Sequence, residues 1–164
     1  MINESTKEIK RIKIKADMLL YKYADGKRDF RNISLIGADL RNVNLRGVDF
    51  RGSVLSSSYF DNANLKDADF SDAIIINAFF ENADLTRASF RNANLGFSSF
   101  AYANLKNAYF MEADLTRADF YKADLSNADF RGAKLKATSF KNVILKNGKI
   151  ILDGNANVVI KDIF

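Results

Sequence analysis

The sequence contains no cysteine and no histidine, and these absences exclude several kinds of chemistry. Without cysteine there is no disulfide framework, no thiolate metal site and no cysteine nucleophile. Without histidine the chain lacks the commonest general base and transition-metal ligand, so a Ser–His catalytic pair is impossible. The eight glycines are scattered and form no phosphate-binding loop. We therefore predict no enzyme: no catalytic residues, no cofactor and no metal site.

Long hydrophobic runs are missing as well. The N-terminal segment has no apolar run long enough for a signal peptide, and no stretch approaches the roughly 20 apolar residues of a membrane span. We expect a cytoplasmic protein with no membrane partner. The net charge of +5 lies at the ends, because residues 29–140 hold thirteen basic and fourteen acidic side chains.

What the chain does have is a large apolar residue at every fifth position from Phe30 to Ile150. A period of five fits neither a helix nor a strand, so the chain must be a repeat architecture. Two residues before each of these centres the side chain is small: between Ala63 and Ala133 every such residue except Ser98 is Ala. Residues two apart point to the same side of an extended segment, so both positions face an interior.

The polar positions predict the corners of the repeat. Asp or Asn usually precedes the centre, and the turn-forming residues Asn, Gly, Asp and Ser are frequent at the second position after it. From Phe50 to Phe140 the centres at multiples of ten are Phe, and those between them are Leu except Ile75. Alternating Phe and Leu sides require an even number of sides, and four sides give a coil of about twenty residues.

Segments such as ANLKD, ADLTR and ADFYK resemble the pentapeptide repeat family, and LLYKYADGKRDF is similar to the lead-in of its cyanobacterial members. The resemblance implies an all-β fold, a right-handed quadrilateral β-helix. Roughly six coils at the ~4.8 Å strand spacing predict a rod about 30 Å long. The expected core centres are Phe50, Leu65, Phe70, Phe90, Leu95, Phe100, Leu105, Phe110, Leu115, Phe120, Leu125 and Phe130.

Three regions are expected: an N-terminal extension with a capping helix (1–27), the β-helix (28–152) and a C-terminal capping strand (153–164). Caps are needed because an open coil exposes unpaired backbone groups. Residues 16–24 predict a short amphipathic helix, and residues 7–14 fit either strand or helix. The final strand either closes the rod or pairs with another copy. The helix residues expected to cover the first coil are Met18, Leu19, Tyr21 and Tyr23.

Two charged arrangements are candidate sites. Four aspartates fall in one coil but on different sides, so they cannot converge on one ion: Asp114, Asp119, Asp124 and Asp129. A basic outward column offers phosphate contacts: Arg46, Lys66, Lys106 and Lys146. Asn and Asp interleave this column and no outward aromatic residue accompanies it, so we do not expect nucleic-acid binding.

Outward apolar residues are the remaining signal. Positions that are polar elsewhere hold Val54, Tyr59, Ile74, Ile76 and Phe79, which belong to neighbouring coils and adjacent sides. A contiguous apolar patch requires an explanation, unlike scattered exposed residues. The alternatives are drift in a permissive repeat, cover by the N-terminal tail, or a surface for a protein partner or self-association.

The sequence therefore predicts a non-enzymatic, rigid repeat scaffold for protein–protein interaction. The resemblance also offers an alternative, since some pentapeptide repeat proteins mimic DNA and bind DNA gyrase and related topoisomerases. A DNA mimic requires a strong negative field. The near-neutral body of residues 29–140 disfavours that function.

Overall fold

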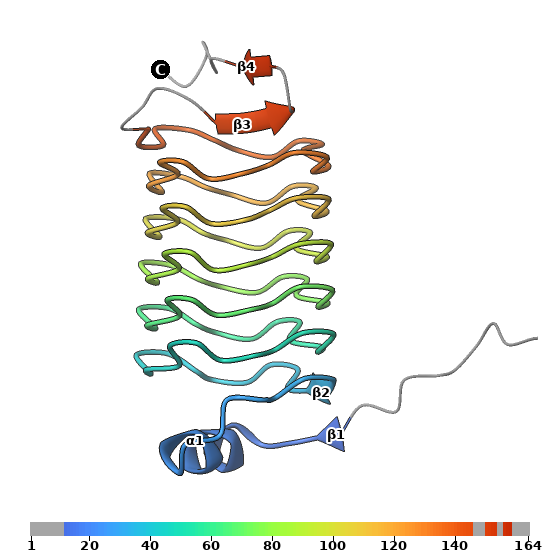
Figure 1. The fold of residues 1–164 in the computed structure, drawn as a ribbon, viewed down its shortest axis with the longest axis vertical. Coiled ribbons are helices and arrows are strands. Elements are labelled where there is room, and N and C mark those ends of the chain that lie inside the picture. Colours follow the sequence, from blue (N-terminus) through green and yellow to red (C-terminus); the bar gives the residue numbers. More distant parts are fainter. Residues whose placement is uncertain (1–11, 146–149, 154–155, 159–164) are drawn as a thin grey trace, which may run out of the picture.

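The computed structural model describes residues 12–145, 150–153 and 156–158. Most of these residues form a stack of coils around one long axis (Figure 1). Parallel β-bridges join residues twenty apart, from Asp29 with Asp49 to Asp124 with Ile144. A turn follows every fifth residue, so one coil takes twenty residues and has four short sides, as the alternation of Phe and Leu predicts.

Each corner is a two-residue turn whose second residue has a positive φ. Every fifth residue from Asn32 to Asn142 has a φ between 55° and 71°. The next N–H donates to the carbonyl of the preceding centre, as from Ala63 to Phe60 (3.0 Å), which is the arrangement of a type II turn. Corners that are not Gly, Asn or Asp adopt the same φ: Ser57, Arg87, Phe97, Tyr102, Glu112, Arg117, Lys122 and Ala137.

Hydrogen bonds between coils use the other backbone groups. The N–H of Phe50 donates to the carbonyl of Asp69 in the next coil (2.8 Å), and the N–H of Asp49 donates to the backbone carbonyl of Arg28 in the preceding coil (2.9 Å). Corner N–H groups also donate to the next coil, as from Asn62 to the carbonyl of Glu81 (2.8 Å). Each side is thus held from above and below.

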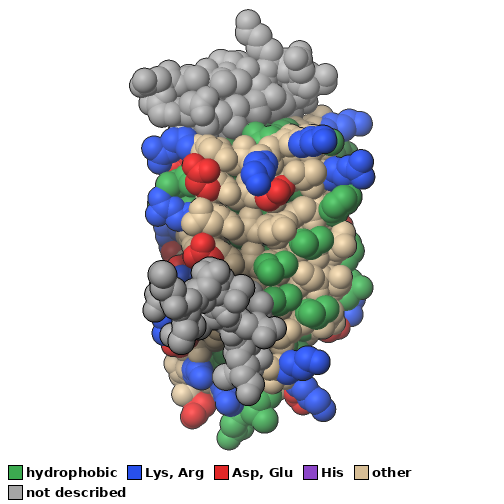
Figure 2. All heavy atoms as spheres, turned by 90° about the vertical axis from the view of Figure 1, so that its right-hand side faces the viewer, with side chains coloured by type: hydrophobic (Ala, Val, Ile, Leu, Met, Phe, Trp, Pro, Cys, Tyr) green, Lys and Arg blue, Asp and Glu red, His purple; other side chains and the backbone are tan. Residues whose placement is uncertain are grey.

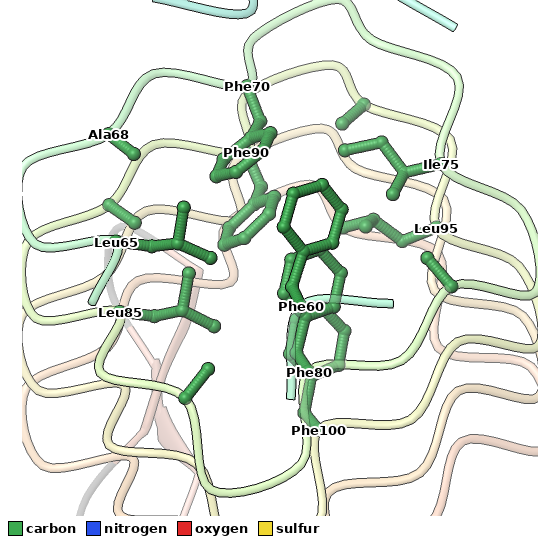
Figure 3. Packing of buried hydrophobic residues seen from close by; sticks show 14 of the residues in the cluster. Phe60, Leu65, Ala68, Phe70, Ile75, Phe80, Leu85, Phe90, Leu95 and Phe100 are labelled. Atoms are coloured by element: carbon green, nitrogen blue, oxygen red, sulfur yellow. The ribbon is translucent and has the colours of Figure 1, made fainter. Parts of the chain in front are cut away.

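The interior is filled by four columns of side chains. All twelve expected core centres are at most 1% exposed, and the alanines two residues before the centres, from Ala63 to Ala128, are equally buried. The ring of Phe100 stacks between Phe80 and Phe120, with centroids 4.9 Å away on both sides. It meets Phe90 of the other Phe column edge to face. Leu and Ile side chains point toward these stacks from both sides (Figure 3).

The N-terminal end is covered by helix α1 (Ala16–Ala24), and strand β1 (Ile12–Lys13) pairs in parallel with β2 (Ile33–Ser34). Residues 12–13 are therefore strand, and residues 7–11 lie outside the described residues.

One face of α1 covers the first coil. Leu19 is fully buried, and the Tyr23 hydroxyl donates to the carbonyl of Arg46 (2.8 Å). The expectation for Met18 and Tyr21 was wrong, since they are 49% and 73% exposed. The helical period turns these two residues to the opposite face.

At the other end, β3 (Ile150–Asp153) and β4 (Ala156–Val158) form an antiparallel pair, in which Ile150 lies opposite Val158. This pairing differs from the parallel bridges of the coils. Residues 154–155 and 159–164 of the expected capping strand lie outside the described residues, as does Lys146.

We expect Phe100→Ala to lower the free energy of unfolding by about 3–5 kcal/mol, because it removes a ring from the middle of a stack. Ala103→Phe should also destabilise, by about 1–3 kcal/mol or more, because the filled interior has no room for a second ring. Urea unfolding followed by circular dichroism measures both. The exposed residue Lys136, changed to Ala, is the control. An unchanged midpoint for Ala103→Phe would contradict the inward placement of the small residues.

Two adjacent serines test the corner geometry. Ser57 has a φ of 58°, whereas Ser56 lies at the preceding turn position and has no positive φ. Ser57→Gly should stabilise by about 0.5 kcal/mol, because the relief of left-handed strain exceeds the entropy cost of glycine. Ser56→Gly should destabilise by about 0.5–1 kcal/mol. Thermal unfolding of the two variants measures both effects. Shifts of the melting temperature of the same sign and size would mean that the corner carries no strain.

Candidate interaction surface

The five outward apolar residues lie together on two neighbouring coils. Val54 is bridged to Ile74, and Tyr59 is bridged to Phe79 on the adjacent side. The rings of Tyr59 and Phe79 stack with centroids 5.1 Å apart, and these residues are 40% and 37% exposed. Val54, Ile74 and Ile76 are half-buried. We call these five residues the apolar patch. Figure 2 shows hydrophobic side chains gathered along one part of the lateral surface.

Further exposed apolar residues extend these two sides. Ile36, Phe97 and Tyr102 are each at least half exposed, and Tyr121 meets Tyr102 edge to face at 5.5 Å. Cations lie over several of the rings: Arg41 over Tyr59, Arg117 over Phe97, and Lys122 over Tyr102 and Tyr121. The surface therefore combines exposed rings with basic side chains at their border.

The residue before each centre has a structural role that the sequence analysis missed. Where this residue is Asp or Asn, its side-chain oxygen accepts a hydrogen bond from the backbone N–H of the residue after the centre. The other four backbone N–H groups of the repeat donate to neighbouring coils or close the turn. The four aspartates of one coil do this at 3.0–3.1 Å: Asp114 for Thr116, Asp119 for Tyr121, Asp124 for Ser126 and Asp129 for Arg131. Recurrent Asp or Asn two residues before a turn position was the available signal.

This role means that the apolar patch lacks hydrogen bonds that other repeats form. Val54, Tyr59, Ile74 and Phe79 occupy the position of that acceptor. The side chains of Val54, Ile74 and Phe79 have no acceptor atom, and the only one of Tyr59 is the hydroxyl at the far end of its ring. The coil thus lacks this local hydrogen bond at four neighbouring places where apolar surface is gained, although the N–H of Glu81 beside Phe79 donates instead to Asp61 (3.0 Å).

Ion pairs neutralise the charged columns. On the side of Phe30 and Phe50, Arg31 pairs with Asp29 (2.7 Å) and Arg51 with Asp49 (2.6 Å). The basic column proposed for phosphates is paired too: Arg46 with Asp67 (3.2 Å), Lys66 with Asp84 (3.1 Å) and Lys106 with Asp124 (3.2 Å). A phosphate backbone would have to displace these carboxylates.

These ion pairs lower the pKa of the carboxyl groups. The side-chain hydrogen bond from Arg41, helped by its backbone N–H, lowers the pKa of Asp39 from 3.8 to about 2. The side-chain hydrogen bond from Arg31 likewise lowers the pKa of Asp29. At neutral pH both carboxylates are therefore ionised.

Within the described residues, no group of three or more His, Cys, Asp or Glu side chains is arranged to hold a metal ion. No helix in the same part of the chain is long and apolar enough to cross a membrane.

The pentapeptide repeat region family matches residues 27–100 and 83–150. The chain belongs to the pentapeptide repeat family. This membership implies the right-handed quadrilateral β-helix of that family. No curated protein matches the chain.

Solved structures of the same family are similar to this chain. A pentapeptide repeat protein from the Arabidopsis thaliana thylakoid lumen is 26% identical, with a TM-score of 0.51; the match covers 76% of this chain and 88% of that one. One from Nostoc Pcc 7120 is 28% identical (TM-score 0.40; 84% and 99% covered). QnrB1, a plasmid-mediated fluoroquinolone resistance protein, is 19% identical (TM-score 0.41; 78% and 85% covered).

The ion pair of Asp39 predicts a pH dependence. Because its pKa is lower in the folded chain than its ordinary value of 3.8, its contribution to stability is present above that value and is lost as the pH falls toward about 2. Arg41→Gln should return the pKa of Asp39 toward 3.8. NMR titration of the Asp39 carboxyl carbon measures this, with Arg117→Gln as the control. An unchanged pKa in Arg41→Gln would contradict the assignment of the shift to this pair.

Proposed function

We propose that this chain is a non-enzymatic, rigid scaffold for protein–protein interaction, and that the apolar patch is its contact surface. The right-handed, four-sided coil of about six turns would serve as a stiff support that holds the two adjoining sides of the patch in fixed positions. Its place is proposed to be the cytoplasm, a prediction that rests on composition alone.

The observation that carries the proposal is the replacement of the hydrogen-bond acceptor by apolar side chains at four neighbouring positions. The interior gains nothing from these side chains, because the centres Leu55, Phe60, Ile75 and Phe80 already fill it. The stacked pair of Tyr59 and Phe79 presents rigid aromatic area of the kind that dominates the energetics of protein interfaces. Drift and cover by the N-terminal tail are the competing explanations.

The gyrase-binding alternative has weaker support. QnrB1 shares the fold, but the similarity is too low to transfer a role. A DNA mimic needs unpaired negative charge, whereas carboxylates such as Asp29, Asp39 and Asp49 are paired with arginines of their own coil.

The first test changes the patch without changing the coil. Ile74→Asp with Ile76→Asp should leave the melting temperature nearly unchanged, because Asp114 already occupies the position of Ile74 two coils further on and accepts the local N–H. Self-association or capture of a partner should fall. Sedimentation velocity and a pull-down from the source cell measure these effects.

The matched control is Ile144→Asp. Ile144 also precedes a centre and is 50% exposed, but it lies on the opposite side of the coil. Binding through the patch should resist salt, since it is mainly hydrophobic. If the double variant and the wild type sediment identically and capture the same proteins, the patch is not a contact surface.

A second test addresses the alternative. The purified wild-type protein at micromolar concentration should neither inhibit DNA gyrase supercoiling nor protect the enzyme from a quinolone, because the coil surface has no sustained negative field. QnrB1 is a suitable comparison protein in the same assay. Clear inhibition or protection would favour gyrase binding over the proposed function.

A further inference from the structure

The arginines on the side of Phe50, Phe70 and Phe90 follow a pairing rule. A carboxylate reaches such an arginine either from two residues before it or from eighteen residues after it, in the next coil. Arg51 has both partners, Asp49 at 2.6 Å and Asp69 at 3.6 Å. Arg31 likewise has Asp29 at 2.7 Å and Asp49 at 3.7 Å. These arginines are therefore compensated by the repeat itself.

Arg91 breaks this rule. The two positions from which a carboxylate would reach it hold Ser89 and Tyr109. Within the described residues no carboxylate lies in ion-pair contact with Arg91, and its guanidinium donates to the sulfur of Met111 (3.5 Å). A thioether is a weak acceptor, so most of the five N–H donors of this exposed arginine face solvent.

Arg91 also lines a shallow depression in the side of the rod. The depression arises where small residues, Ser71 and Ser89, replace the arginine and aspartate found at the equivalent positions of the second coil, and their hydroxyls lie 2.9 Å apart. Two acidic groups of the lining have partners: Asp69 accepts the Ser71 hydroxyl (2.5 Å), and Asp72 accepts the side-chain amide of Asn92 (3.2 Å). Arg51 and Arg131 line the same depression, and each is paired with an aspartate. Arg91 interacts with Asp129, the partner of Arg131, only at a distance beyond ion-pair contact, so its guanidinium is the cation of the lining that can pair with a ligand.

The depression adjoins the apolar patch. Asp72 and Asn92 are the corners that lead from the side of Phe70 and Phe90 to the side of Ile74. A molecule seated on Ile74 and Ile76 would therefore reach across this corner to Arg91. Interfaces combine an apolar centre with such polar groups at the border, and arginine is among the residues that contribute most to binding.

We propose that Arg91 binds a carboxylate side chain of the protein that covers the apolar patch. This inference rests on the proposed function and specifies the chemistry of the partner: an apolar surface with an aspartate or glutamate at its edge. The guanidinium fork matches a carboxylate with two parallel hydrogen bonds. A nucleic-acid backbone fits less well, because it would bring several phosphates against Asp69, Asp72 and Glu112 of the lining, whereas a single carboxylate needs to approach only Arg91.

Acetate is the probe for the site on the purified protein. Chloride is replaced stepwise by acetate at constant ionic strength, and the arginine Nε–Hε signals are followed by NMR. The Arg91 signal should shift markedly, whereas those of Arg51 and Arg131, each paired with an aspartate, should not. Equal shifts at the three arginines would overturn the proposal. A parallel titration with inorganic phosphate separates the ligand classes, and much tighter binding of phosphate than of acetate would also overturn it.

A second measurement uses whatever complex or self-association the patch test detects. Arg91→Gln should weaken it about ten-fold, as expected for loss of a hydrogen-bonded charge pair, while Arg131→Gln should have little effect. The acetate titration needs no partner, so its failure would leave the patch experiment untouched. Conversely, a patch variant without effect would remove the proposed function even if Arg91 binds acetate. Equal binding by both arginine variants would exclude Arg91 from the interface.

Discussion

The rest of the structure depends on a backbone corner with positive φ at every fifth residue. An L-residue ordinarily avoids this region at a cost of roughly 1–2 kcal/mol, yet Phe97 and Arg117 adopt it as Asn92 does. The coil above and the coil below fix the corner, because its N–H is held by the next coil, as from Phe97 to Thr116 (3.0 Å). Once the corner is fixed, only three residues remain for each side, and the first and third of these must point inward.

That constraint explains which features were predictable. The centre and the small residue are always two apart, so the alternation of Phe and Leu with Ala between them was enough to predict the inward columns and an even number of sides. The resemblance to the family then implied four sides, and so a coil of twenty residues. The corners were predictable only where Asn, Asp or Gly marks them. At Tyr102 or Lys122 the side chain gives no sign of a turn, and the neighbouring coils impose the conformation.

Other features depend on relationships that the five-residue pattern does not display. The role of Asp114 and its equivalents concerns a backbone N–H, and a repeated aspartate looks the same whether it accepts that N–H or simply faces water. Arg91 has no ion-pair partner because the residues two before it and eighteen after it are not acidic. These positions are recognised as neighbours of Arg91 only once the coil geometry is known. At the N-terminus the helix was predicted correctly, but the orientation of Met18 and Tyr21 depends on which face of that short helix meets the first coil.

The columns also restrict how a rod of this kind can change length. Phe100 stacks on rings twenty residues before and after it, and so do the other interior Phe residues in the middle of the stack, such as Phe90. Insertion of five residues would place Leu above Phe in all four columns, and insertion of ten would move every later outward residue to the opposite side. Only whole coils of twenty residues can be added or removed while the apolar patch and its bordering charges keep their alignment. Related rods are therefore expected to differ in length by whole coils. Each outward residue then stays on the same side of the rod and only moves along its axis.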